Sequence, residues 1–166
     1  MELRFFGNSQ DLEMDWYEAK TSVNGRDVQV VLSLEESEDD ALPSEAYFTQ
    51  CGATLEQFES ISEKLLTQIQ EEGRTATDES SDVYFYIDYL IRVLDENEWL
   101  QIIPRKNSVK KSLYQQAIEA LHLTQAVVYP DNTIVWDYTA SAKLLDHLIA
   151  VVTDIDGNFL SLSIES

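Results

Sequence analysis

The segment Asp154-Ile155-Asp156-Gly157-Asn158 carries side-chain oxygens of the kind that calcium prefers. An EF-hand loop requires glycine at its sixth position and glutamate at its twelfth. If Asp154 is the first position, Glu165 falls at the twelfth, but the glycine falls at the fourth. If Gly157 is the sixth position, the first is Val152, which has no oxygen to offer. Both registers fail, so the segment is predicted to be a hairpin turn and no metal is expected.

Cys51 is the one cysteine of the sequence, and His122 and His147 are its two histidines. A nucleophilic cysteine needs a base and an orienting group beside it, and no local motif links these three residues. A single cysteine also excludes an intramolecular disulfide and a zinc site built on cysteines. The five glycines fit turns and helix ends rather than a phosphate-binding loop. We therefore predict no catalytic residue, no cofactor and no enzymatic activity.

The negative charge of the chain is concentrated in its first two thirds. The formal net charge is −20, with 31 Asp and Glu against 11 Lys and Arg. Residues 1–104 contain 24 acidic and 6 basic residues, whereas residues 105–166 contain 7 and 5. A surface this acidic repels nucleic acid and anionic lipid and attracts basic proteins. We expect a basic protein partner, and neither a nucleic acid nor a membrane.

The densest acidic segment, within residues 35–53, is predicted to be an exposed loop around Pro43 and to dock that partner. Two aromatic residues adjoin it, and interface cores favour aromatic side chains surrounded by polar ones. The alternative is that these charges only form a solvated face. The candidate partner-binding residues are Glu35, Glu36, Glu38, Asp39, Asp40, Glu45, Tyr47 and Phe48.

The basic cluster of the sequence consists of Arg105, Lys106, Lys110 and Lys111. A helix is predicted to begin near Ser108, and cations at the start of a helix oppose its dipole. We expect these side chains to pair with the acidic body of the protein. Contact with a phosphate or with RNA is the alternative.

Strands are predicted at both ends of the chain. Asn24-Gly25 suits the positive φ angles of a type I′ turn, which predicts a hairpin over residues 16–34. Further hairpin turns are expected at residues 130–132 and at Asp156-Gly157. The predicted strands span residues 2–6, 16–23, 28–34, 125–129, 133–138, 148–153 and 159–165.

Helices are predicted in the middle of the chain. Thr54 and Gln57 have the spacing of a capping box, and an apolar stripe of helical period follows them. The acidic residues 95–98 are predicted to break the helical region. The predicted helices span residues 54–73, 81–94 and a third segment from about Ser108.

This order of elements predicts an α+β fold: a single antiparallel sheet of about six to seven strands, with about three helices packed on one face. A chain of 166 residues fits a single domain, residues 1–166. Its start lacks the basic and apolar regions of a signal peptide. The longest aliphatic run, residues 148–152, is far shorter than the ~20 residues that span a bilayer. We expect a soluble, cytoplasmic protein.

The carboxy-terminal part contains Asp137-Tyr138-Thr139, the run Leu144–Val152, Asp156-Gly157-Asn158 and the ending Ile164-Glu165-Ser166. Together with Phe5-Phe6-Gly7 and the Asn24-Gly25 turn, these segments resemble a family of small acidic bacterial proteins that is known as a domain of unknown function. The resemblance covers most of the chain and contains no chemical motif. It implies a bacterial cytoplasmic α+β protein and transfers no catalytic residue.

In charge and size the chain is also similar to immunity proteins of bacterial toxin systems. Nucleases have basic surfaces because they bind phosphates, so an acidic inhibitor can occupy the substrate cleft and associate quickly. The hypothesis from the sequence is a non-enzymatic immunity protein that neutralises a basic, nuclease-type bacterial toxin by direct binding. The alternatives are a DNA-mimic or regulatory protein that binds a nucleic-acid-binding protein, and an uncharacterised enzyme.

Overall fold

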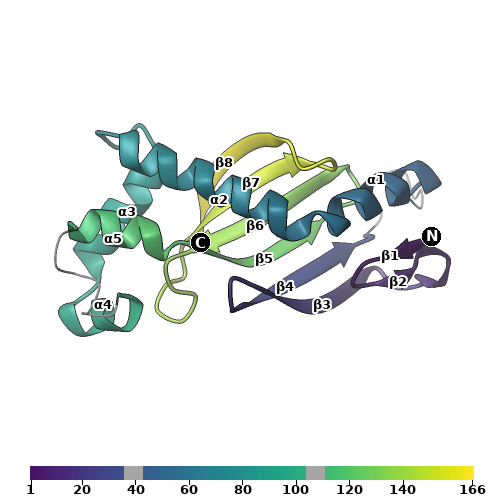
Figure 1. Cartoon of the computed structure of the whole chain (residues 1–166), viewed down its shortest axis with the longest axis horizontal. Helices are drawn as coiled ribbons and strands as arrows, with labels where there is room; N and C mark the ends of the chain where they lie inside the picture. Colours follow the sequence, from purple (N-terminus) through teal and green to yellow (C-terminus); the bar gives the residue numbers. More distant parts are fainter. Residues whose placement is uncertain (36–42, 104–110) are drawn as a thin grey trace.

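The computed structural model describes residues 1–35, 43–103 and 111–166 (Figure 1). Within these residues, strands at both ends of the chain enclose five α-helices in sequence, so the predicted α+β class is confirmed. The amino-terminal elements are β1 (Glu2–Leu3), β2 (Gly7–Asn8) and a 3₁₀ turn at Ser9–Asp11. The longer strands are β3 (Trp16–Val23), β4 (Arg26–Ser33), β5 (His122–Val128), β6 (Thr133–Thr139), β7 (Leu148–Asp154) and β8 (Phe159–Glu165). The helices are α1 (Glu45–Glu56), α2 (Phe58–Thr75), α3 (Asp82–Val93), α4 (Glu96–Ile102) and α5 (Leu113–Ala120).

The six longer strands form one sheet in the order β3-β4-β5-β6-β7-β8, and β1 pairs separately with β2. The size of the main sheet agrees with the prediction. Its purely antiparallel character was wrong, because β4 and β5 are parallel. The helices lie between these two strands in sequence, so the chain crosses over the sheet and returns in the same direction, as a parallel pair requires.

The predicted hairpins are confirmed, and their turns explain them. Asn24 and Gly25 have φ angles of 51° and 77°, the two positive values that a type I′ turn requires. In the β7–β8 turn, the carboxylate of Asp154 accepts hydrogen bonds from the backbone N–H groups of Asp156 at 3.0 Å and Asn158 at 2.9 Å. The segment that resembled a calcium loop is therefore a hairpin turn, and its backbone N–H groups donate hydrogen bonds to the carboxylate of Asp154.

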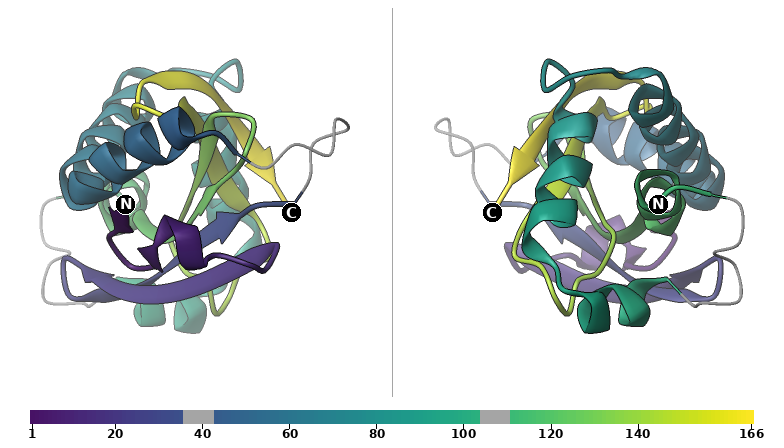
Figure 2. Two further views of the ribbon diagram at one scale, coloured as in Figure 1. Left: turned by 90° about the vertical axis from the view of Figure 1, so that its right-hand side faces the viewer. Right: turned by 90° about the vertical axis from the view of Figure 1, so that its left-hand side faces the viewer.

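The helices cover one face of the sheet and one of its ends. Helices α1 and α2 lie along one face, while α3, α4 and α5 gather at the end drawn on the left of Figure 1. No helix of the described residues covers the other face of the sheet (Figure 2), which we call the open face. The expectation of about three helices on one face is corrected, because the described residues contain five helices, which are divided between this face and one end of the sheet.

Residues 45–53, predicted to be an exposed loop, belong to α1. Its start is capped by Ser44, whose Oγ accepts a hydrogen bond from the backbone N–H of Tyr47 at 3.1 Å. Tyr47, Cys51 and Leu55 recur every four residues and are buried, so α1 has a short apolar stripe on the core. The acidic composition of the segment concealed this stripe.

The predicted capping box at Thr54 was also wrong. Thr54 lies inside α1, where its hydroxyl group donates a hydrogen bond to the carbonyl oxygen of Ile155. The two helices separate at Gln57, and α2 begins at Phe58. Thr54 therefore ties α1 to the β7–β8 turn instead of starting a helix.

Two helix starts follow from local capping. Asp95 and Glu98 form a reciprocal capping box, so the acidic residues predicted to break the helical region instead begin α4. Ser112 and Gln115 form the same arrangement before α5. The predicted helix start at Ser108 lies outside the described residues.

The core lies between the sheet and helices α1 and α2. Trp136 of β6 is fully buried, and its ring centroid is 5.2 Å from that of Phe58 in α2. Its indole N–H donates to Oγ1 of Thr153 on β7 at 3.0 Å. The hydroxyl group of Tyr138 donates to the carbonyl oxygen of Ser62 at 2.8 Å. These bonds satisfy the polar atoms of large aromatic side chains and fix α2 to the inner face of the sheet.

Candidate functional site

The open face presents two rows of side chains that cross the strands. Side chains alternate along a strand, so every second residue points to this face. The strand register aligns a polar row of Lys20, Gln29, Gln125 and Asp137. It aligns a valine row beside it, which consists of Val31, Val127, Val135 and Val152. In the valine row, Val31 and Val127 are buried and Val135 and Val152 are half-buried, so the groups that can bind or titrate belong to the polar row.

Asp137 lies half-buried in the polar row. Burial raises the pKa of its carboxyl group to about 6, and the negative charge of Glu165 on β8 is the second cause. Gln125 donates a long hydrogen bond of 3.5 Å to this carboxylate through Nε2. A carboxyl group perturbed by burial and by a like charge is typical of functional sites, although structural networks produce it too.

Further carboxylates converge on Tyr129, which follows β5. Burial raises the pKa of its phenol, and the charges of Asp137, Asp131 and Glu35 raise it further. Glu35 and Asp131 are exposed. The backbone carbonyl of Tyr129 accepts a hydrogen bond of 3.0 Å from the hydroxyl group of Tyr47. This hydrogen bond ties helix α1 to the end of β5, next to the open face.

The edge strand β3 adds an exposed aromatic side chain to the same face. Trp16 is 41% exposed, and its indole N–H donates to Oε1 of Glu18 at 2.8 Å. Tyr17, between them, packs against the core, so Trp16 and Glu18 point outward. Tryptophan beside polar groups is a frequent anchor in protein interfaces.

We call Glu18, Glu35, Asp131, Asp137 and Glu165 the open-face carboxylates. Among the described residues, none of them forms an ion pair. The ion pairs found there all involve helices or their connections. They are Arg4–Glu59, Arg74–Glu71, Arg92 with Glu79 and Asp88, and Lys111–Glu119. The open face therefore carries negative charge that these cations leave uncompensated.

The structure brings one of the predicted docking residues, Glu35, to the open face. Glu45 is exposed in the first turn of α1. Phe48 is half-buried and, with Pro43 and Glu45, borders a hollow of about 260 Å³. The remaining acidic candidates, Glu36, Glu38, Asp39 and Asp40, lie outside the described residues.

Tyr47 requires a correction as a docking residue. It is only 4% exposed and packs edge-to-face on Phe48, with 5.3 Å between the ring centroids. Helix α1 turns its apolar stripe inward, which leaves Tyr47 almost no surface for a partner. Its contribution to the open face is the hydrogen bond to Tyr129.

Cys51 and His147, two of the residues considered for catalysis, pack against neighbouring side chains of the fold. Burial raises the pKa of the Cys51 thiol to about 12, so it stays protonated at neutral pH and is a poor nucleophile. His147 packs on Tyr89 with 4.8 Å between the ring centroids. In residues 1–35, 43–103 and 111–166, no group of three or more His, Cys, Asp or Glu side chains is placed to hold a metal ion.

The basic cluster is described only at Lys111. Its Nζ atom lies 2.5 Å from Oε1 of Glu119, as expected for pairing with the acidic body. Arg105, Lys106 and Lys110 lie outside the described residues. No helix of the described chain is both long and apolar enough to cross a membrane.

Sequence reasoning missed most of the open-face carboxylates. The period-two pattern of residues 16–23 was a usable signal, because it places Trp16 and Glu18 together on the outer side. Asp131, Asp137 and Glu165 meet only through the pairing of strands, which no local spacing reveals.

Asp137→Asn is expected to stabilise the protein at pH 7. The folded carboxyl group has a pKa of about 6 against an ordinary 3.8, so the folded state binds a proton more tightly than the unfolded chain does. The unfavourable contribution of Asp137 to wild-type stability should therefore shrink as the pH falls from about 7 to about 4, and the stability advantage of the variant should shrink with it. The side chain is partly exposed, which limits the gain at pH 7 to the order of 1 kcal/mol.

Urea unfolding of both proteins at pH 7 and pH 4 measures this difference. An Asp137→Asn variant that is equally or less stable than the wild type at pH 7 would contradict the conclusion that the charged carboxylate of Asp137 lowers the free energy of unfolding.

Comparison with known proteins adds no family assignment. No protein-family model, no curated protein and no solved structure matches this chain. The resemblance to small acidic bacterial proteins stays a hypothesis.

Proposed function

We propose that this protein is a non-enzymatic binding protein that holds a basic protein partner against the open face of its sheet. The partner class that we favour is a nuclease-type bacterial toxin domain, which would make this chain an immunity protein. One observation carries the proposal: the five open-face carboxylates share one surface and form no ion pair within the described residues.

Electrostatics gives this arrangement a physical role. Like charges on one surface repel each other in the free protein, and cations of a partner relieve that repulsion. Asp137 is the sharpest case, because its charge is half-buried next to Glu165. A negative face also raises the rate at which a positive partner arrives. The exposed ring of Trp16 offers an apolar contact beside these charges.

A nuclease fits this surface because its own ligand is a polyanion. Its cleft must carry Lys and Arg to neutralise phosphates, and carboxylates on a stiff sheet can occupy the same positions. A nucleic-acid-binding regulatory protein presents the same charge and is the alternative partner. Nuclease activity of the captured protein, and its loss on adding this chain, separates the two.

Capture from the native bacterium at low salt, with two matched variants, tests the proposal. The open-face variant carries Glu18→Gln, Glu35→Gln, Glu165→Gln and Asp131→Asn. The control carries Glu56→Gln, Glu63→Gln, Glu72→Gln and Asp82→Asn on exposed positions of α1, α2 and α3. Both variants lose four negative charges. We expect wild type and control to retain one basic protein and the open-face variant to lose it.

Equal loss in both variants would show that net charge alone attracts the partner. Equal retention in both would remove the open face as the docking surface. Circular dichroism of each variant confirms that the fold is kept before capture is compared.

A further inference from the structure

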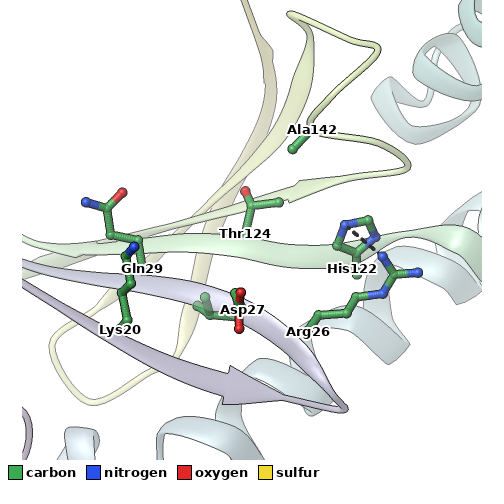
Figure 3. A pocket seen from close by; sticks show the side chains of 8 residues that line it. Lys20, Arg26, Asp27, Gln29, His122, Thr124 and Ala142 are labelled. Atoms are coloured by element: carbon green, nitrogen blue, oxygen red, sulfur yellow. Dashed lines mark hydrogen bonds between the residues drawn. The ribbon is translucent and has the colours of Figure 1, made fainter.

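We propose that the hollow beside Arg26, at one end of the polar row, binds a small organic molecule that carries a single carboxylate or phosphate group. The hollow has a volume of about 430 Å³. It crosses strands β3, β4 and β5 (Figure 3). The polar side chains that line it are Lys20, Arg26, Asp27, Gln29, His122 and Thr124. This inference does not depend on the protein partner proposed above.

Lys20 and Arg26 belong to the half of the described cations that form no ion pair within the described residues, and they lie at the same hollow. Four of the eight Lys and Arg side chains in the described part of the chain form ion pairs with carboxylates. Lys20 and Arg26 form none there, yet both line the same hollow. In a chain with 31 acidic and 11 basic residues, two such cations at one hollow make a local positive site on an otherwise negative protein.

The contact between Arg26 and His122 fixes the hydrogen-bonding state of the imidazole ring. Nη1 of Arg26 lies 3.4 Å from Nε2 of His122, and a guanidinium group can only donate. Nε2 must therefore be the acceptor, which leaves the proton on Nδ1. That atom lies 2.9 Å from the carbonyl oxygen of Ala120 and donates to it. Burial lowers the pKa of His122, and the charge of Arg26 lowers it further, so the ring is neutral at pH 7.

A neutral His122 orients Arg26 without neutralising it. Only one of the five N–H groups of the guanidinium is directed to the ring. The others have no hydrogen-bond partner among the described residues and can bind two oxygens of one anion in parallel, which is the strong geometry for carboxylate and phosphate. Lys20 contributes a second positive charge from the neighbouring strand (Figure 3).

The other polar side chains of the hollow indicate which hydrogen-bonding groups the ligand carries besides its anionic group. The hydroxyl group of Thr124 donates to the carbonyl oxygen of Asp137 at 3.1 Å, so its oxygen is left to accept. Asp27 also accepts, and Gln29 can do either. Asp27 disfavours a polyanion, so the ligand carries one anionic group and a hydrogen-bond donor. The volume lies within the range usual for small-molecule sites.

The test uses three probes of similar shape at about 0.15 M sodium chloride, an ionic strength that screens weak surface attraction. Benzoate and phenyl phosphate carry the anionic group, and benzamide is the neutral counterpart of benzoate. Nuclear magnetic resonance of the labelled protein follows each titration through the signals of Arg26, His122 and Thr124. We expect saturable binding of at least one anion and at least tenfold weaker binding of benzamide. The bound anion should also raise the pKa of His122, because it favours the imidazolium ion.

Variants assign the binding to Arg26. Arg26→Gln should weaken it at least tenfold, and Arg26→Lys, which keeps the charge but loses the planar group, should fall between. Lys64→Gln on exposed α2 removes an equal charge elsewhere and should bind like the wild type. The ratio of the two anion affinities tells whether carboxylate or phosphate is recognised.

Non-saturating shifts, equal binding of benzamide, or equal binding by Arg26→Gln would each overturn the proposal. Loss of partner capture by the open-face variant leaves this result unaffected, because Arg26 and Lys20 are unchanged there. The two proposals can therefore fail separately.

Discussion

Trp136→Ala is expected to lower the free energy of unfolding by about 3–5 kcal/mol, the range for removing a large aromatic side chain from a core. The side chain is fully buried against Phe58, so its loss leaves a cavity between α2 and the sheet. It also leaves the hydroxyl group of Thr153 without its indole donor. Urea unfolding at pH 7 measures the change.

Two further tryptophan variants make this prediction specific. Trp136→Phe keeps a ring but loses the indole N–H, and should cost about 1–2 kcal/mol, so it remains informative if the alanine variant does not fold. Trp16→Ala removes the exposed ring of the open face and should change stability by less than about 0.5 kcal/mol. Comparable losses at both tryptophans would contradict the assignment of one to the core and the other to the surface.

The second large effect concerns association with the basic partner. The open-face variant, with its four neutralised carboxylates, should bind the captured partner with an on-rate at least about tenfold lower at low salt. Its on-rate should also depend less on ionic strength, because fewer charges steer the encounter. Surface plasmon resonance at two salt concentrations measures both effects.

The control variant on α1, α2 and α3 has the same net charge and serves as the reference. If its on-rate falls as far as that of the open-face variant, steering comes from net charge and not from this face. Trp16→Ala should act mainly on the off-rate, because an apolar contact forms after the encounter.

The parts of the fold that were predicted correctly depend on local signals. Asn24-Gly25 and Asp156-Gly157 specify tight turns, and the strands beside them alternate or run apolar. Helix α3 begins after Ser81, as its composition indicated. These features are encoded within a few residues of each other, so one sequence suffices to find them.

The errors have identifiable physical causes. Helix α1 buries only a short stripe within an acidic segment, and its burial is decided by the sheet against which it packs. Asp95-Glu96-Asn97-Glu98 has the acidic composition of a loop, but Asp95 and Glu98 also have the spacing of a capping box, and this spacing starts α4. The parallel pairing of β4 with β5 joins residues that are 96 positions apart in sequence, such as Gln29 and Gln125. No local pattern specifies such a contact.

For the candidate site, the sequence predicted that the surface is negatively charged but not which residues form it. An acidic surface for a basic partner followed from composition, and Glu35 was among the residues named. Asp137 and Glu165 were not, because they become neighbours only when β6, β7 and β8 pair. The cationic hollow was equally hidden, since Lys20, Arg26 and His122 come from three strands.

Carboxyl-group footprinting of the complex tests the central claim most directly. Carbodiimide labelling, read by mass spectrometry, reports how accessible each exposed carboxylate is in the free protein and in the complex with the captured partner. The open-face proposal predicts that labelling of Glu18, Glu35, Asp131 and Glu165 falls severalfold on binding. Labelling of Glu56, Glu63, Glu72 and Asp82 should stay unchanged. Protection of the helix carboxylates, with the open-face set still labelled, would contradict the account.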